Sequence, residues 1–167
     1  MCIRDSSERI ADRHEFRLAR RACFQRIGRK SRSIKDIRDF LRKRSHTESI
    51  IELTVDRLRE MGLLDDERFA NEAAASMARR TPSSARFLEH RLRGHGVSRE
   101  DAAKAAVEAA GDPLEAAMKV AIKAARSLKS YAPDVRRQRL HGRLARRGFD
   151  YDVIQQAIDK AMQEMDA

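Results

Sequence analysis

The stretch Gly62-Leu63-Leu64-Asp65-Asp66-Glu67-Arg68-Phe69-Ala70 decides how this chain folds, because it ends one helix and begins the next. Gly62 has no Cβ and adopts the left-handed conformation of a helix C-terminal cap without steric cost. Asp65 or Asp66 is expected to start the following helix, since its carboxylate can accept from the free N–H groups of the first turn. Acidic side chains there also favour the positive end of the helix dipole.

Three apolar residues of the same stretch are expected in a core. Leu63 and Leu64 stand between the two helices and should pack in the seam between two helical units. Phe69 lies in the first turn of the new helix and should be its first core residue. The nonapeptide therefore predicts a boundary between two units of similar build.

The composition favours helices over strands. Among 167 residues, 5% are aromatic, none is Trp, and Gly and Pro number seven and three. Ala, Leu, Arg and Glu are common whereas Val and Ile are sparse, and this balance favours helix. Charged residues reach 37%, which suits thin helical units with much exposed surface. We therefore predict an all-α chain.

Apolar spacing, glycines and capping residues predict the helices one after another. The expected segments are 7–27, 34–43, 48–60, 66–80, 85–93, 99–110, 114–130, 135–146 and 151–165. Side chains just before these segments are expected to cap them, namely Ser33, Thr47, Ser98, Asp112, Asp134 and Asp150. Leu18 and Val107 are among the residues expected on apolar faces.

A repeat of about fifty residues defines the architecture. Leu41, Leu92 and Leu144 are 51 and 52 residues apart, and each lies six residues before an expected capping residue. We predict three tandem three-helix repeats at 8–64, 65–111 and 112–167, with a disordered start at 1–7. Because small units bury little apolar area alone, neighbours should pack in series as an elongated, curved array, right- or left-handed.

The charge points to an anionic partner. Lys and Arg number 36 against 26 Asp and Glu, for a net charge of +10. Residues 1–47 carry fifteen basic and six acidic residues, so most of the excess lies there. Such an excess indicates a polyanion or an acidic protein surface as partner. The alternative is a charge that only serves solubility.

No pattern of residues predicts catalysis. The five histidines lack the spacing of a metal site, and no glycine-rich phosphate loop is present. Asp65, Asp66 and Glu67 could hold Mg²⁺ in a nuclease, but helix capping explains them fully. We therefore expect no enzyme activity, no metal and no cofactor.

The compartment follows from what the sequence lacks. Cys2 and Cys23 do not form a disulfide framework, and no apolar run is long enough to span a membrane. The first twelve residues are too polar for a signal peptide. We expect a cytoplasmic monomer without membrane contact.

The second helix of every expected repeat is rich in arginine, which is the better functional signal. The candidate contact residues are Arg38, Arg42, Lys43, Arg44, Arg86, Arg91, Arg93, Arg136, Arg139, Arg143, Arg146 and Arg147. Guanidinium groups bind phosphate or carboxylate with two parallel hydrogen bonds. These helices contain few acids that could pair with them, which favours a basic binding stripe over a solvated face. No aromatic residues interleave the stripe, so base stacking should not dominate.

Four motifs resemble the RecX family over residues 20 to 162. They are Ser33-Ile34-Lys35-Asp36-Ile37 with Leu41, the stretch Gly62 to Ala70, Phe87 to Leu92 with Gly96-Val97, and Arg146-Arg147-Gly148-Phe149-Asp150-Tyr151 with Ile154. The first has Asp36 and Phe40 where Glu and Lys are usual, and the third departs from the usual pattern after Leu92. The four motifs in this order, in register with a threefold repeat, are specific.

The resemblance implies a non-enzymatic regulator of the RecA recombinase in recombination, DNA repair and the SOS response. RecX-like proteins lie in the groove of the RecA–DNA filament, restrain ATP hydrolysis and strand exchange, and limit filament growth. The implied partners are RecA and single- or double-stranded DNA, bound with or through RecA. The alternative is a general basic helical protein that binds DNA without RecA.

Overall fold

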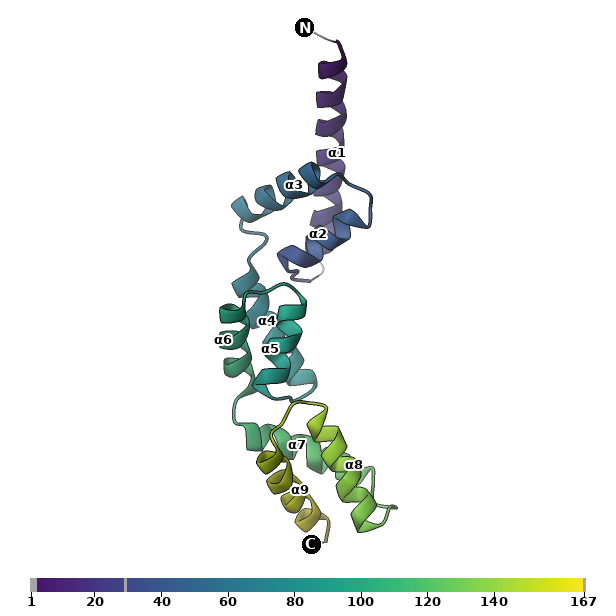
Figure 1. Ribbon diagram of the computed structural model, residues 1–167, viewed down its shortest axis with the longest axis vertical. Helices are drawn as coiled ribbons and strands as arrows, with labels where there is room; N and C mark the ends of the chain where they lie inside the picture. Colours follow the sequence, from purple (N-terminus) through teal and green to yellow (C-terminus); the bar gives the residue numbers. More distant parts are fainter. Residues whose placement is uncertain (1–2, 29, 167) are drawn as a thin grey trace. The chain divides into compact units, whose positions relative to one another are not determined.

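All regular structure in the described part of the chain is α-helical. The computed structural model describes the backbone of residues 3–28 and 30–166 and the side chains of residues 12–28 and 30–164. The helices are α1 (Ile3–Ile27), α2 (Ile34–Arg42), α3 (Glu48–Glu60), α4 (Asp66–Arg80), α5 (Ala85–Gly94), α6 (Arg99–Ala110), α7 (Pro113–Arg126), α8 (Pro133–Ala145) and α9 (Tyr151–Asp166) (Figure 1). The predicted all-α fold is confirmed. The repeat boundaries and the curvature of the array stay predictions.

Three of the predicted helix ends are wrong. Helix α1 begins at Ile3 and overlaps the expected disordered start, because residues 3–7 contain no Gly or Pro to stop it; residues 1–2 lie outside the described residues. Helix α7 ends at Arg126, and turns follow it to residue 130. Helix α8 begins at Pro133, with Ala132 as N-cap, because proline suits the first helical position. The expected cap Asp134 therefore lies inside the first turn.

The chain divides into two compact units, residues 1–69 with 95–97 (unit 1) and residues 70–94 with 98–167 (unit 2). In unit 1, α3 packs against both α1 and α2 (Figure 1). The core consists of Ala19, Cys23, Ile37, Leu41, Ile50, Ile51, Val55, Leu58 and Leu64. Leu18 is half exposed, contrary to the predicted apolar side of this helix, because Ala19 and Cys23 take the face that meets α3.

The stretch that begins at Gly62 ends α3 and begins α4, as predicted. Gly62 has a φ of 66°, and the N–H of Leu63 donates to the carbonyl of Leu58 at 2.9 Å, which ends α3. Leu64 is 4% exposed in the core of unit 1. Asp65 Oδ1 accepts from the N–H of Arg68 at 2.9 Å and is therefore the cap of α4.

Asp66 has a different role, so of the two aspartates it is Asp65 that caps α4. Its Oδ1 accepts from the N–H of Ile34 at 2.9 Å, so it holds the first turn of α2, 32 residues earlier in the chain. Ser33 caps the same turn by accepting from the N–H of Asp36 at 3.0 Å. Two side chains thus satisfy N–H groups that a helix start leaves free.

Unit 2 has its main core among α7, α8 and α9, whereas α5 packs closely on α6. Asp112 caps α7 by accepting from the N–H of Glu115 at 2.7 Å, and Ser98 caps α6, as predicted. Val107 is 66% exposed although it was expected to face inward. The alanines Ala102, Ala105 and Ala106 occupy the buried face of α6, and Val107 lies one residue, or about 100°, away from it.

Candidate polyanion-binding surface

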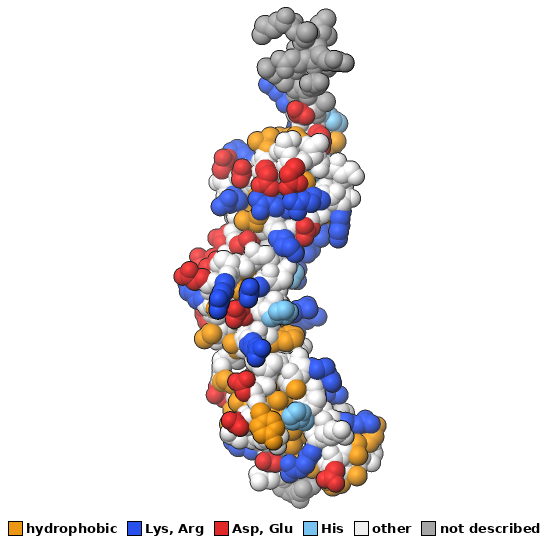
Figure 2. All heavy atoms as spheres, in the orientation of Figure 1, with side chains coloured by type: hydrophobic (Ala, Val, Ile, Leu, Met, Phe, Trp, Pro, Cys, Tyr) orange, Lys and Arg blue, Asp and Glu red, His pale blue; other side chains and the backbone are white. Residues whose placement is uncertain are grey.

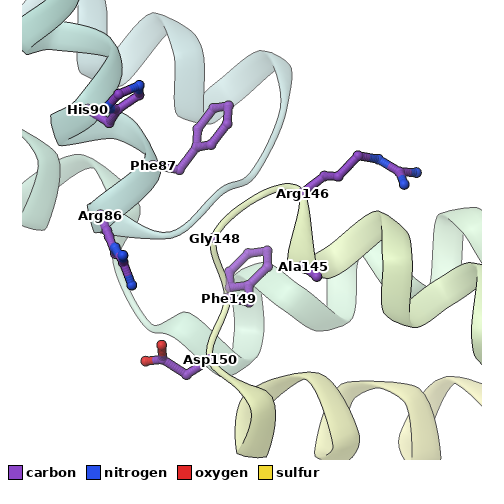
Figure 3. Close-up of a pocket in the computed structure, with 8 residues that line it drawn as sticks. All are labelled: Arg86, Phe87, His90, Ala145, Arg146, Gly148, Phe149 and Asp150. Carbon is purple, nitrogen blue, oxygen red and sulfur yellow. The ribbon is translucent and has the colours of Figure 1, made fainter.

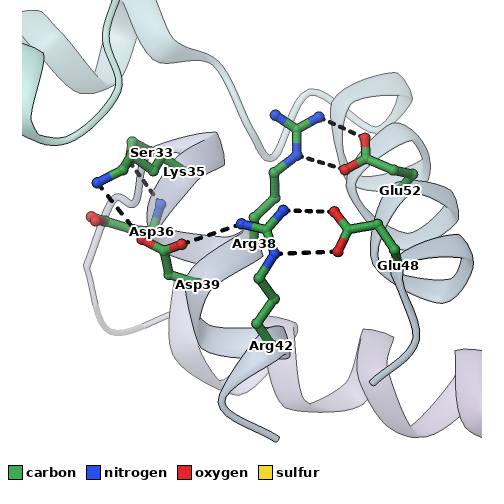
Figure 4. Close-up of polar contacts among 8 residues, drawn as sticks. All are labelled: Ser33, Lys35, Asp36, Arg38, Asp39, Arg42, Glu48 and Glu52. Carbon is green, nitrogen blue, oxygen red and sulfur yellow. Dashed lines mark hydrogen bonds and ion pairs between the residues drawn. The ribbon is translucent and has the colours of Figure 1, made fainter. Parts of the chain in front are cut away.

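The arginines of α2 are already paired with acids of α3. Arg38 donates from Nε and a terminal nitrogen to the two carboxylate oxygens of Glu52, at 2.8 and 2.6 Å. Arg42 binds Glu48 in the same two-point manner, at 3.2 and 2.6 Å (Figure 4). In Figure 2 a row of acidic side chains accordingly lies against a row of basic ones in the region of α2 and α3. Helix α2 itself holds few acids, as expected, but its arginines find carboxylate partners on the neighbouring helix α3.

These pairs keep both groups charged. The hydrogen bond from Arg38 lowers the pKa of Glu52, and the hydrogen bond from Arg42 lowers the pKa of Glu48. In return, both carboxylates raise the pKa of the arginines. Each guanidinium thus presents its two-donor edge to a carboxylate, and a phosphate would have to compete for that edge.

Arg44 and Lys43 lie beyond the end of α2. The guanidinium of Arg44 lies 4.7 Å from the ring centroid of Phe40, and Arg26 lies 4.5 Å from the same centroid. Both arginines therefore make cation–π contacts with the ring. Lys43 is exposed and is the C-cap of α2.

The arginines of α5 have no carboxylate partner within the described residues. Arg86, Arg91 and Arg93 are all exposed, and none makes an ion pair with any residue whose side chain is described. The main packing partner of α5 is α6, whose buried residues are Ala102, Ala105 and Ala106. The charge of the three arginines is therefore available to a partner.

The arginines of α8 and of the turn that follows it fall into two groups, engaged and free. Arg137 is engaged, because it pairs with Asp159 of α9 at 2.6 Å. Arg136 donates to the carbonyl of Tyr131 at 3.2 Å, and Arg147, half-buried, donates to the carbonyl of Pro82 at 3.4 Å. Burial lowers the pKa of Arg147, and nearby Arg143 and Arg146 lower it further. Arg139, Arg143 and Arg146 are exposed and make no ion pair with described residues, although Arg139 stacks on Tyr131 at 3.9 Å.

Three shallow hollows connect the free arginines of unit 2. The first, of about 460 Å³, is lined by Arg86, Phe87, His90, Ala145, Arg146, Gly148, Phe149 and Asp150 (Figure 3). A second, of about 310 Å³, shares Arg146 and adds Arg139 and Arg143. A third, of about 330 Å³, shares Phe87 and adds Arg80 and Arg91. We call Arg80, Arg86, Arg91, Arg139, Arg143 and Arg146 the arginine track.

Two members of this surface were not expected from the sequence. Arg80 is the last residue of α4, where basic residues also interact favourably with the helix dipole. The adjacent arginines Arg79 and Arg80 are the sequence feature that could have indicated it. His90 lies one turn after Arg86 on α5, on the face that lines the first hollow. Asp150 is the one carboxylate that lines this hollow, beside Arg86 in Figure 3.

The described residues contain no group of three or more His, Cys, Asp or Glu side chains that could hold a metal ion. Cys23 is buried in the core of unit 1, and burial raises the pKa of its thiol to about 11. No helix among the described residues is long and apolar enough to cross a membrane. The hollows of unit 2 therefore offer cationic side chains as their distinctive chemistry.

Comparisons with known proteins give a consistent result. The family model of the RecX third three-helix domain matches residues 111–158. The regulatory protein RecX of Prosthecochloris aestuarii is 32% identical over 136 residues, which cover 81% of this chain and 88% of that protein. RecX of Chlorobium phaeobacteroides is 31% identical over 151 residues, which cover 89% and 94%.

Solved structures show the same fold. A crystal structure of regulatory protein RecX superposes with a TM-score of 0.78 at 22% identity, covering 95% of this chain and 79% of that one. RecX from Lactobacillus salivarius superposes with a TM-score of 0.69 at 20% identity, covering 92% and 97%.

Proposed function

The chain belongs to the RecX family of regulatory proteins, and from this premise we propose that it is a non-enzymatic modulator of the RecA recombinase. It binds the RecA–DNA filament in its groove and restrains ATP hydrolysis, strand exchange and filament growth. Its role lies in recombination, DNA repair and the SOS response. It acts in the cytoplasm as a monomer and needs no cofactor.

The arginine track is the observation that carries this proposal. Its six side chains are exposed, and none makes an ion pair within the described part of the chain. A filament of protein on DNA presents phosphates in a regular row, and guanidinium groups bind phosphate with two hydrogen bonds. We therefore narrow the predicted contact residues toward unit 2, because Arg38 and Arg42 are engaged within unit 1.

Restraint follows from linkage between binding and filament state. A ligand shifts a conformational equilibrium only by its difference in affinity for the two states. The protein lowers the rate of ATP hydrolysis if it binds an inactive or capped filament more tightly than the active one. A protein that binds both states equally would coat the filament without effect.

The test measures single-strand-DNA-dependent ATP hydrolysis by RecA with this protein added at substoichiometric ratios. The wild-type chain is expected to inhibit at these ratios. The track variant, with Arg86→Gln, Arg143→Gln and Arg146→Gln, is expected to inhibit only at much higher ratios. The control variant, with Arg38→Gln, Arg42→Gln and Arg137→Gln, removes the same charge from paired arginines and should inhibit nearly as well as wild type.

A general DNA-binding protein is the second candidate, and the free arginines favour it too. About six phosphate contacts would make log K fall with log salt at a slope of roughly −5. If the chain binds DNA with this slope but leaves RecA hydrolysis unchanged up to equimolar amounts, the RecA proposal is wrong. The chain is then a basic helical protein that shares the family's fold but not its partner.

A further inference from the structure

We infer that the DNA backbone is bound by the arginine track of unit 2 and not by the paired arginines of α2, Arg38 and Arg42. This inference deepens the proposed function and rests on it for the identity of the polyanion. It assigns the phosphodiester backbone as ligand to the arginine track. It does not assign this ligand to α2, although the sequence of α2 is also rich in arginine.

The α2 arginines are poorly suited because their donors are occupied. Arg38 and Arg42 each place two donors on one carboxylate, with shortest distances of 2.6 Å. A phosphate that bound these arginines would displace Glu52 and Glu48. The two carboxylates would then lie unpaired beside the negative charge of the phosphate. Like charges at this distance repel, so each exchange would gain little.

The track presents the opposite situation. On α8 and at its C-cap, Arg139, Arg143 and Arg146 are spaced four and three residues apart, so they lie along one face of the helix. Arg146 lines the same hollow as Arg86 and His90 of α5, which joins the basic faces of the two helices. Phosphates that follow one another along a DNA strand can therefore be met by successive side chains without any ion pair being broken.

The character of the surface favours a nucleic acid backbone over an acidic protein. Interfaces between proteins commonly centre on exposed aromatic or aliphatic anchors. The large hydrophobic side chains exposed in unit 2 are Val107, Tyr131, Val135 and Tyr151, and none of them lines the three hollows. Backbone binding needs charge and hydrogen-bond donors but no apolar anchor.

The same argument predicts weak sequence preference. None of the exposed Phe and Tyr rings lines the three hollows, and the exposed ring of Tyr131 has the guanidinium of Arg139 over it, 3.9 Å from its centroid. Contacts to phosphate carry no base information. DNA molecules of equal length but different sequence are therefore expected to have dissociation constants within about threefold of one another.

The test is binding of fluorescent 20-nucleotide single-stranded and 20-base-pair duplex DNA, followed by anisotropy at several salt concentrations and without RecA. Loss of three phosphate contacts should reduce the duplex log–log salt slope of the track variant by about 2.7 and weaken binding roughly 100-fold at about 0.1 M salt. The control variant, with Arg38→Gln, Arg42→Gln and Arg137→Gln, should keep a slope within about one of wild type. Circular dichroism melts establish that both variants are folded.

Each outcome decides the inference. Equal losses in both variants would mean that net charge alone matters, and a loss confined to the control variant would reverse the assignment; either result overturns it. If the track variant binds DNA normally but loses binding to RecA without DNA, the track is a protein surface and the inference is wrong. If DNA binding divides as expected while RecA hydrolysis is unaffected by the wild-type chain, the inference stands and the proposed function fails.

Discussion

Helices α2 and α5 each receive, at their first turn, a glycine loop from later in the chain, but the two loops are held by different chemistry. On α2, His95 Nδ1 lies 3.1 Å from both carboxylate oxygens of Asp36, and Gly96 packs against the side chain of Lys35. On α5, the N–H of Ser84 donates to the carbonyl of Arg147 at 3.1 Å, and Gly148 packs against Ser84 and Phe87.

The two helices differ in their charges as well. Arg38 and Arg42 of α2 are paired with acids of α3, whereas Arg86, Arg91 and Arg93 of α5 are exposed and make no ion pair with described residues. The difference teaches that a repeated sequence position predicts a repeated backbone arrangement but not a repeated surface. Both loops require a glycine, Gly96 or Gly148. The side chains around the glycine differ, and the arginines of the two helices are held in ion pairs in α2 and left exposed in α5.

Among the substitutions that test the difference between the two loops, Gly148→Ala should reduce the free energy of unfolding most. Gly148 has a φ of 76°, and an added Cβ would lie 2.6 Å from Ser84 Oγ and 3.2 Å from Phe87 Cβ. The loop cannot move away, because the next residue, Phe149, is 6% exposed in the core of unit 2. We expect unit 2 to lose about 3 kcal/mol of unfolding free energy, from left-handed strain and overpacking together.

Urea unfolding followed by circular dichroism measures this loss, and hydrogen exchange of the Ser84 amide gives a local readout. The amide should exchange faster in the variant because its bond to Arg147 is disturbed. Gly94→Ala is the control, since Gly94 lies in a helix with no atom within 4 Å of an added Cβ. A loss below about 1 kcal/mol would contradict the account of the loop.

Gly96→Ala should cost less, about 2 kcal/mol, although its φ of 82° is just as unfavourable. An added Cβ would lie 2.7 Å from Lys35 Cβ, so the loop has to lift from α2. Lifting is tolerable because the loop is held by the half-exposed pair of His95 and Asp36. Urea unfolding of both glycine variants ranks the two loops, and a larger loss for Gly96→Ala would show that the α2 loop is held more firmly.

Arg38→Gln and Arg143→Gln separate structural from free arginines. Arg38→Gln removes a two-point pair that is about one-third exposed, and we expect a loss of about 0.5–1 kcal/mol after allowance for solvent screening. Arg143→Gln should leave the free energy of unfolding unchanged, because Arg143 has no ion-pair partner among the described residues. Chemical denaturation of both variants checks the contrast, and equal losses would contradict the division between paired and free arginines.

The smallest expected effect is on the pH dependence of unit 1. Arg38 and Arg42 lower the pKa of Glu52 and Glu48 below the usual value of 4.5, so folding favours the ionised carboxylates. Their contribution is present above the unfolded pKa and is lost as pH falls through the lower folded value. The stability difference between wild type and Glu52→Gln should therefore shrink as pH falls below about 4.5. Urea midpoints at a series of pH values test this, and a difference that grew at low pH would give the opposite sign.

Local signals in the sequence predicted most helix ends and caps. Ser33, Ser98 and Asp112 cap as expected because each bonds an N–H only three residues away. Thr47 takes the N-cap position of α3 but its side chain does not cap; Glu15 accepts from its N–H instead, at 3.3 Å. That bond joins residues 32 positions apart, and no local pattern announces it.

The sequence predicted which helices are rich in arginine but not which of these arginines are free to bind a partner. The arginine-rich helices were evident, yet only packing shows that Arg38 and Arg42 meet acids of α3 and that Arg147 donates to Pro82. The hollows of unit 2 depend on Arg146 and Arg86 coming together from helices 60 residues apart in the chain. Spacing within one helix carries no information about such neighbours.

The sequence by itself determined the helical class, the family motifs and the glycine turns, because caps and turns depend on interactions within a few residues. Gly62 and Asp65 illustrate this, since their partners lie within six residues. The tertiary structure alone decided which charges are paired and which are free. Ion pairs between helices depend on which faces pack together, and Asp66 reaching back to Ile34 shows how a residue that reads as a local cap becomes a contact between helices.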